Sequence, residues 1–369
     1  MGGTTRSGDV EYVHIDPRLF YSCLAILLAA YYYYHQILNA PPRSHDGSKP
    51  LKISEIYVYP IKSLRGTRVK AALATKNGFQ YDRTFMLLKV TPEGLKNMLV
   101  AQYYEMTQFL TSIEQPTVNE KKKPSLKVDF VSPKGPKVDP LIIPLEPDTT
   151  NLETLDVTMH RSSTSAFKMP TEYNAWFSKC FGYEVVLAYL GPNRRDVLFE
   201  DLKSSLDEHQ ITFSDCAPYM VASKTSLSDV SSRFSDGKEM DMTKFRPNIV
   251  VEGAQEPWQE DFWAELNING VNVPLAHNCV RCRSINVDYA TGEQAPGEEG
   301  EVLKKLQKDR RVDPGMKWSP VFGRYGYWKK NQGPKPFSVG DEVFVTKVNK
   351  ERTTWTWKSD WGAEEPAAQ

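Results

Sequence analysis

Short apolar runs separated by turn-forming residues predict a body built mainly from strands. In the run KISEIYVYP at 52–60 the apolar side chains fit an extended segment that Pro60 ends, so Lys62 and Ser63 just beyond it should lie on a loop. The lysine-rich run at 121–124 is expected to form a solvated turn. Further strands are expected at 84–90, 126–130, 141–144, 321–328 and 342–348.

Two later segments carry a helical pattern instead. At 171–181, Trp176, Phe177 and Cys180 fall on one apolar stripe, which places Cys180 in the core. Gly182 follows as a C-terminal cap and should end the helix. A second helix is expected at 298–310.

The stretch at 19–38, LFYSCLAILLAAYYYYHQIL, is the longest apolar run of the chain. It has no formally charged side chain apart from titratable His35, and twenty helical residues span roughly 30 Å. The tyrosines at 31–34 suit a membrane interface, and Pro41 ends the helix. We therefore expect a single transmembrane anchor, with a cleaved signal peptide or a buried helix as alternatives. The basic residues around it slightly favour a cytosolic C-terminal body.

The pattern divides the chain into six segments, with a change of domain around 191–210. They are an N-terminal tail (1–18), the anchor (19–38), a proline-rich linker (39–50), a first β-rich domain (51–195), a second β-rich domain (196–350) and a C-terminal tail (351–369).

Composition narrows the classes of function. Lys plus Arg and Asp plus Glu both number 46, so the net charge is zero and a nucleic acid is not expected as the main partner. The five cysteines are too few and too unevenly spread for a disulfide framework, which favours a reducing compartment.

The densest candidate for chemistry is HNCVRCRSINVDYATGE at 277–293, which contains Cys279 and Cys282 before a strand-like run. A zinc site would need a second Cys or His pair with suitable spacing, and a redox dithiol would precede a helix. Two core cysteines are the plain alternative, but Arg281 and Arg283 suit an apolar interior poorly. A thiolate beside two guanidinium groups would be a soft metal ligand. Spacing alone leaves all four interpretations open.

This segment resembles the cysteine segment of MOSC domains, especially those of the mitochondrial amidoxime-reducing component group, in which a C-x-R-C run is followed by V-D-x-x-T-G. Further landmarks of the resemblance occur in order: YPIKS at 59–63 with Asp82-Arg83, FSDCAPY at 213–219, KFRPNIVV at 244–251 and SPVFGRY at 319–325. The resemblance implies an α+β, predominantly β fold. In it, an N-terminal β-barrel-like domain packs on a β-barrel MOSC domain with peripheral helices, after a single transmembrane helix.

The resemblance also implies a molybdenum–molybdopterin cofactor, with Cys282 as the protein ligand to the metal and Cys279 as a non-ligand. Asp215 is implied as a second catalytic residue that orients water or passes protons. We expect Arg246 and Asn248 to face the pterin from one side of a strand. The implied cofactor contacts are Lys62, Ser63, Arg83, Asp215, Cys216, Ala217, Arg246, Asn248, Val280, Arg281, Cys282 and Tyr325.

The sequence departs from the animal pattern at three of these positions. Cys216-Ala217 stands where Thr-Ser is usual, and Val280 stands where a hydroxyl residue is common. Side-chain hydroxyl contacts are therefore lost at these positions, and any contribution shifts to the peptide groups.

The implied activity is reduction of N-hydroxylated compounds such as amidoximes and hydroxylamines. The chain has no G-x-G-x-x-G after a strand and no flavin or haem signature, so its electrons would come from an external donor. The resemblance implies that this donor is a cytochrome b5-type carrier fed by an NADH-dependent flavoprotein reductase. The implied location is the mitochondrial outer membrane, with the endoplasmic reticulum as the alternative and the lipid bilayer as a partner. Two other functions stay open: a sulfurtransferase acting through a cysteine persulfide, and a non-catalytic cofactor carrier. Pyridoxal phosphate binding is a secondary expectation of the resemblance.

Overall fold

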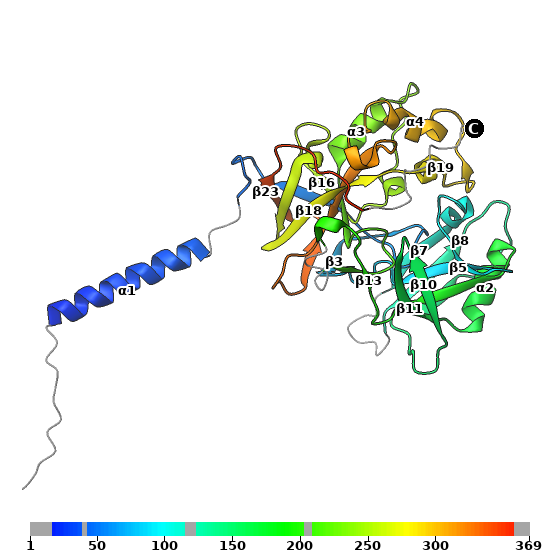
Figure 1. Ribbon diagram of the computed structural model, residues 1–369, viewed down its shortest axis with the longest axis horizontal. Helices are drawn as coiled ribbons and strands as arrows, with labels where there is room; N and C mark the ends of the chain where they lie inside the picture. Colours follow the sequence, from blue (N-terminus) through cyan, green and yellow to red (C-terminus); the bar gives the residue numbers. More distant parts are fainter. Residues whose placement is uncertain (1–16, 39–42, 115–122, 203–208, 358–369) are drawn as a thin grey trace, which may run out of the picture. The chain divides into compact units, whose positions relative to one another are not determined.

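The computed structural model describes residues 17–38, 43–114, 123–202 and 209–357 (Figure 1). The chain forms two units, residues 1–42 and 43–369. The described part is predominantly β with few helices, which confirms the predominantly β character of the predicted fold class. Half of the lysine-rich run predicted as a turn, 121–122, lies outside the described residues.

The first unit contains α1 (Pro17–Leu38), so the helix predicted at 19–38 is present. Among the described residues, however, no helix combines the length and the apolar character needed to cross a membrane. The physical reason is the hydroxyl content of α1, because Tyr21, Ser22 and the tyrosines at 31–34 lower the mean hydropathy of a helix otherwise rich in Leu and Ala. The predicted transmembrane anchor is therefore not supported.

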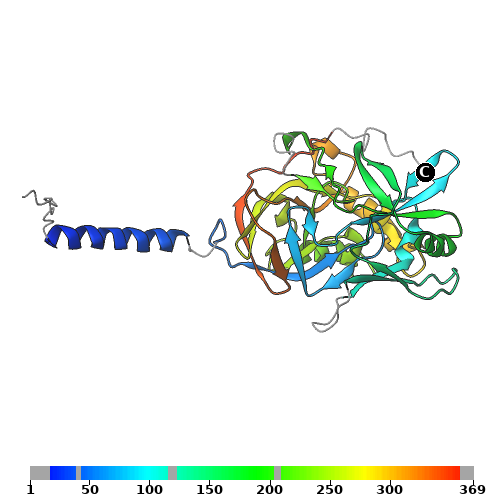
Figure 2. The ribbon, with the colours of Figure 1, turned by 90° about the horizontal axis from the view of Figure 1, so that it is seen from below.

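The second unit is organised around a closed β-barrel. β1 closes the ring because it pairs antiparallel with both β16 and β23, with Ile53 opposite Val251 and Leu51 opposite Val343. Figure 2 shows β1 in blue and the later strands in yellow to red. The strands follow one another around the barrel in the order β1 (Leu51–Val58), β16 (Ile249–Glu252), β15 (Tyr219–Ser223), β21 (Val321–Gly326), β18 (Val271–Val280), β17 (Trp263–Ile268) and β23 (Glu342–Val348).

The rest of the first β-rich region forms separate sheets beside the barrel. α2 (Thr171–Phe181) packs against this part, and Phe177 and Cys180 are buried in its core as predicted. One sheet contains β10 (Thr154–Met159), β11 (Ser162–Lys168), β12 (Val185–Tyr189), β5 (Phe85–Thr91) and β6 (Gly94–Asn97). A second contains β7 (Phe109–Glu114), β8 (Ser125–Phe130) and β9 (Leu141–Pro144).

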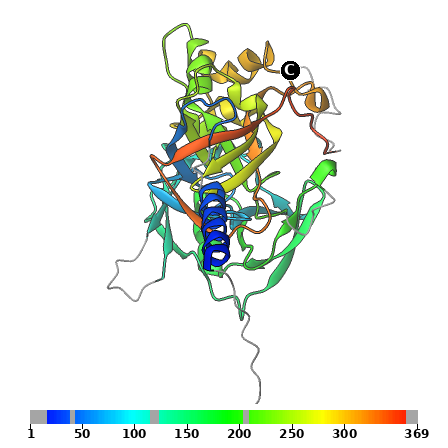
Figure 3. The ribbon, with the colours of Figure 1, turned by 90° about the vertical axis from the view of Figure 1, so that its left-hand side faces the viewer.

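Shorter elements complete the second unit. In Figures 1 and 3, α3 (Lys224–Ser232) and α4 (Val302–Gln307) lie at the opposite end of this unit from the β10–β11 hairpin. The remaining strands are β2 (Thr67–Val69), β3 (Ala71–Thr75), β4 (Gly78–Phe79), β13 (Arg195–Asp196), β14 (Gln210–Ile211), β19 (Val287–Asp288), β20 (Glu293–Gln294) and β22 (Lys335–Ser338).

Most predicted elements are present, and two differ. The structure has strands at 85–91, 125–130, 141–144, 321–326 and 342–348, and α2 ends at Gly182, which adopts the left-handed conformation of a C-cap (φ 77°). The helix expected at 298–310 is a 3-10 turn, η6 (Gly297–Glu301), followed by the short α4. The strand-like run after Cys282 is a 3-10 turn, η5 (Arg283–Asn286), before β19.

A network of buried charged side chains includes Asp261, which precedes β17 in the chain, and Arg324 of β21. Asp261 accepts two hydrogen bonds from Arg310, at 2.8 and 2.9 Å, and one from Arg352 at 2.8 Å. Arg324, also fully buried, donates to the Asp261 carbonyl at 2.9 Å. The neighbouring Glu260 accepts from Ser226 at 2.7 Å, but its Oε1 has no hydrogen-bond partner among the described residues. Burial raises the pKa of Glu260 to about 7.

We predict that Glu260→Gln weakens the pH dependence of stability. Because the folded-state pKa of Glu260 lies above its ordinary value of 4.5, the folded protein holds a proton that the unfolded chain releases as pH rises from about 4.5 to about 7. The free energy of unfolding that Glu260 contributes is therefore lost as pH rises from about 4.5 to about 7. At about pH 8 the substitution should raise the free energy of unfolding by up to about 3 kcal/mol, at about 1.4 kcal/mol per pKa unit, with little change at about pH 4.

Urea unfolding at both pH values tests this, with exposed Glu256→Gln as the control. An equal change in stability at the two pH values would contradict the prediction.

Candidate functional site

A cavity of about 430 Å³ lies where the first β-rich region meets the barrel. Loops that follow β1, β4 and β6 line one side, and segments around β15, β16, β18 and β21 line the other. The structure brings eleven of the twelve predicted cofactor contacts to this cavity: Lys62, Ser63, Arg83, Asp215, Ala217, Arg246, Asn248, Val280, Arg281, Cys282 and Tyr325.

The loop after β1 positions Lys62, as predicted from Pro60. The Lys62 backbone N–H donates to the Phe85 carbonyl at 2.8 Å, and the Arg83 N–H donates to the Tyr59 carbonyl at 2.7 Å. Asp82 binds the Arg83 guanidinium at 2.5 Å and also accepts from the Tyr59 N–H at 2.8 Å. These bonds join the loop at 59–63 to the loop at 82–85, and Lys62 and Arg83 both line the cavity.

The Asp215 carboxylate is the acidic group of the cavity wall. It forms an ion pair with Lys62, whose side chain is 5% exposed, while the Asp215 side chain is 49% exposed toward the cavity. His160 Nε2 lies 3.4 Å from Asp215 Oδ1. Partial desolvation in the cavity wall would by itself raise the pKa of Asp215, but the charge of Lys62 and the hydrogen bond from His160 hold it well below its usual range. Asp215 is therefore an anion at neutral pH.

Arg246 and Asn248 both line the cavity, but the prediction that they face it from one side of a strand is wrong. They do not share a strand face, because Arg246 ends the 3-10 turn η3 (Met242–Phe245) with a left-handed backbone (φ 55°) and β16 begins only after Asn248. The Asn248 amide joins strands, accepting from the Met220 N–H at 3.2 Å and donating to the Tyr57 carbonyl at 3.2 Å. Asn248 therefore holds the wall together, and its amide is already engaged.

Cys282 is exposed in the cavity immediately before η5, with its Sγ 3.2 Å from the Ser284 hydroxyl. The two arginines do not pair with the thiol as the sequence suggested. The Arg281 guanidinium donates to the Phe322 carbonyl, at 3.0 and 2.8 Å, and Arg283 donates to the Ala101 carbonyl at 2.8 Å. These bonds position the backbone on both sides of the thiol.

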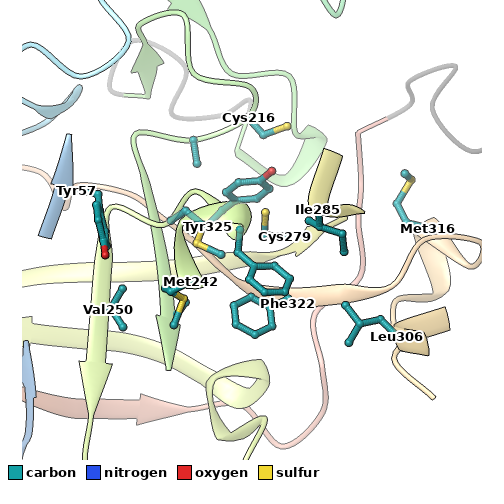
Figure 4. Close-up of a cluster of buried hydrophobic side chains, with 14 of the residues drawn as sticks. Tyr57, Cys216, Met242, Val250, Cys279, Ile285, Leu306, Met316, Phe322 and Tyr325 are labelled. Atoms are coloured by element: carbon teal, nitrogen blue, oxygen red, sulfur yellow. The ribbon is translucent and has the colours of Figure 1, made fainter. Parts of the chain in front are cut away.

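The other two cysteines of the region are buried: Cys279 lines the cavity, and Cys216 lies behind its wall. Figure 4 shows Cys216 and Cys279 beside Tyr325 in the largest apolar cluster. Burial raises the pKa of both thiols, and that of Cys216 well above its ordinary value. The Cys216 side chain does not line the cavity, so its predicted contact with the cofactor does not involve the thiol.

The charge of the cavity wall favours an anionic ligand. Against the single carboxylate of Asp215, the lining residues include five cations: Lys62, Arg83, Lys244, Arg246 and Arg281. Burial lowers the pKa of Lys62 and of Lys244, so a bound anion would stabilise the charged form of both side chains. Among the described residues no cluster of three or more His, Cys, Asp or Glu side chains is placed to hold a metal ion. A metal at Cys282 would therefore take its other ligands from the bound group.

Sequence reasoning missed several residues of the wall. His160, Lys244 and the loop at 99–102 line the cavity. Lys244 belongs to the KFRPN motif and could have been included, whereas nothing in the sequence marked His160. Four lining residues adopt left-handed backbone conformations that non-glycine residues rarely take: Ser63 (φ 69°), Arg83 (50°), His160 (51°) and Arg246 (55°). Such conformations concentrate at functional sites.

Comparison with known proteins gives consistent matches. The MOSC N-terminal beta barrel domain family matches residues 51–184, and the MOSC domain family matches residues 208–344. Mitochondrial amidoxime reducing component 2 of Bos taurus is 29% identical, and mitochondrial amidoxime-reducing component 1 of Homo sapiens is 28% identical. Each alignment covers 79% of this chain and 82% of the relative.

Two further likenesses are weaker. Molybdenum cofactor sulfurase of Arabidopsis thaliana is 26% identical over 79% of this chain, which spans 35% of that relative. The solved structure of the YUAD protein from Bacillus subtilis overlaps 79% of this chain and 93% of its own, with a TM-score of 0.30 and 9% identity, a likeness too distant to bear on the fold.

We predict that Lys62→Met raises the pKa of Asp215. The substitution removes the cation that opposes burial, and burial then favours the protonated carboxyl. A pH titration of carboxyl ¹³C signals by NMR measures the change, with Asp215→Asn to assign the signal. Exposed Lys52→Met is the control and should leave the Asp215 titration unchanged. If Lys62→Met also leaves it unchanged, the ion pair does not hold the carboxylate.

Proposed function

This chain belongs to the MOSC-domain family, and we propose that it is a molybdenum-cofactor oxidoreductase that reduces N-hydroxylated compounds such as amidoximes and hydroxylamines. The observation that carries the proposal is one cavity that combines a cation-rich wall with the exposed thiol of Cys282. The names of the amidoxime-reducing relatives supply the reaction class.

The residues of the cavity suit the proposed cofactor. A thiolate is a soft ligand of the kind that binds molybdenum, so Cys282 would be the protein ligand to the metal. Lys62, Arg83 and Arg246 would hold the phosphate of the pterin, since a guanidinium offers a planar pair of donors to phosphate oxygens. When bound, the cofactor supplies a two-electron centre that accepts an oxygen atom.

The remaining residues of the wall bind and orient the substrate. The Asp215 carboxylate is anionic, so it accepts hydrogen bonds from an N–OH or amine group of the substrate rather than donating a proton. Lys62 keeps that carboxylate in place through their ion pair. The loop at 99–102 lines part of the cavity, and the hydrogen bond from Arg283 to the Ala101 carbonyl joins it to the cysteine segment.

Electrons would come from a separate protein. The sequence has no G-x-G-x-x-G after a strand, and the relatives are named as components, which fits an assembly of several proteins. We propose a cytochrome b5-type carrier and an NADH-dependent flavoprotein reductase as the donors. A mitochondrial location, from the same names, is part of this proposal.

A second candidate is sulfur transfer through a persulfide on Cys282. It is favoured by the likeness to a molybdenum cofactor sulfurase and by the exposure of the Cys282 thiol. Trapping of a persulfide on Cys282 by an alkylating reagent and mass spectrometry distinguishes it from reduction.

We predict that Cys282→Ala loses the metal. Bound molybdenum should fall by about tenfold or more, because changes even to residues that only support metal ligands cost 10–100-fold. Reduction of benzamidoxime with a reconstituted donor chain should fall to background. Metal analysis and pterin fluorescence of protein made in a cofactor-competent host measure the binding.

Cys23→Ala, which removes another exposed thiol, is the matched control and should keep both cofactor and activity. Absence of molybdenum and pterin from the unaltered protein would contradict the proposed function, whereas bound cofactor without reduction would favour a carrier.

A further inference from the structure

We propose that His160 delivers a proton to the oxygen that leaves the substrate, working beside Asp215. The inference rests on the proposed reduction of an N–OH group. The sequence pattern does not identify His160 as a site residue. The β10–β11 hairpin brings it to the cavity.

His160 lies in the two-residue loop of the β10–β11 hairpin. Met159 pairs with Ser162, so His160 and Arg161 alone form the turn, and both have positive φ, 51° and 68°. Such turns normally contain Asn or Gly, because a side chain in the left-handed region costs roughly 1 kcal/mol or more. A histidine held there is in an unfavourable conformation, which is typical of a residue that serves a site.

A buried arginine ties this hairpin to the segment that carries Asp215. The Arg195 side chain is fully buried and donates to the Met159 carbonyl at 3.0 Å, to the Thr212 carbonyl at 3.2 Å and to the Ser214 carbonyl. Met159 directly precedes His160, and Ser214 directly precedes Asp215. One guanidinium therefore positions both members of the pair across the junction of the two regions.

The imidazole itself is held from two sides and faces the cavity. Its Nε2 lies 3.4 Å from Asp215 Oδ1, and its ring meets the Trp357 ring edge-on at 5.9 Å. The side chain is 9% exposed, yet His160 is one of the residues that line the cavity. The Asp215 contact is long for a hydrogen bond, as catalytic contacts often are before substrate binds.

The proposed reaction needs a proton donor at the cavity wall. Over the whole reaction N–OH becomes N–H, the N–O bond breaks, and the oxygen that leaves the substrate ends as water, which consumes two electrons from the external carrier and two protons. Asp215 is anionic, and burial raises the pKa of Tyr325 well above its ordinary value, so neither readily supplies a proton. Imidazole is the side chain that most often transfers protons in enzymes, and His160 lines the cavity beside Asp215. His160 can thus give one proton to the leaving oxygen and recover it from solvent.

The test compares His160→Gly and His160→Asn in the cofactor-loaded full chain. Both residues suit the left-handed turn, so the hairpin and the cofactor content should be preserved while the imidazole is lost. We expect kcat to fall by about a hundredfold or more with KM changed by less than about twofold, in the range of general acid catalysis. Added imidazole should partly restore kcat in His160→Gly. Ser163→Ala, on an exposed position of the same hairpin, is the control and should keep full activity.

A second readout does not depend on activity. In ¹⁵N-histidine NMR spectra of the full chain, the signal absent from His160→Asn identifies His160, and Asp215→Asn should shift it. An unshifted signal, or variants with the kcat of the unaltered protein, would overturn the inference. If the unaltered protein binds cofactor but reduces no N-hydroxylated compound, the proposed function fails, and the NMR result alone then decides whether the pair exists.

Discussion

The pairing of β1 with β16 and β23 is the constraint on which the rest of the structure depends. By completing the barrel, β1 fixes the direction in which the chain leaves at Tyr59. The following loop then carries Lys62 to the cavity, where the backbone bonds to Phe85 and Tyr59 join it to the loop of Arg83. The first and second β-rich regions are therefore joined by the backbone hydrogen bonds of β1 with β16 and β23, and not only by contact between side chains.

The cavity is held by polar groups whose hydrogen bonds are directed at the backbone. Arg195 and Arg281 each bind two or more carbonyls, and the Asn248 amide connects Met220 and Tyr57. A guanidinium offers five donors in a rigid plane, so one buried side chain can fix several loops that have no regular secondary structure. This rigidity allows residues far apart in sequence to hold left-handed conformations at the cavity wall. The same arrangement leaves Lys62 and Arg83 directed at the space where an anion would bind.

Much of the fold and of the candidate site could be predicted from the sequence, and the failures have physical causes. The strand at 141–144 and the helix at 171–181, with its Gly182 cap, depend on local pattern and were predicted to the residue. The place of β1 in the barrel depends on partners about 200 and 290 positions away, which no local pattern encodes. The apolar residues after Cys282 predict a strand but form a turn, because Ile285 and Val287 fit either structure. His160 was missed because its turn contains none of the residues that usually indicate one.

The shared barrel also sets an order of events during synthesis. β1, the first strand of the second unit, needs β23, whose Val343 leaves the ribosome about 290 residues after its partner Leu51, and the ring cannot close before then. Until that moment β1 has an unsatisfied edge, and a nascent chain of this kind exposes apolar surface that invites aggregation. Long sequence separation between partners slows folding because the loop must close before its contacts form. A chain without β23 therefore leaves one edge of β1 unpaired, so a change near residue 343 disturbs the fold near residue 51.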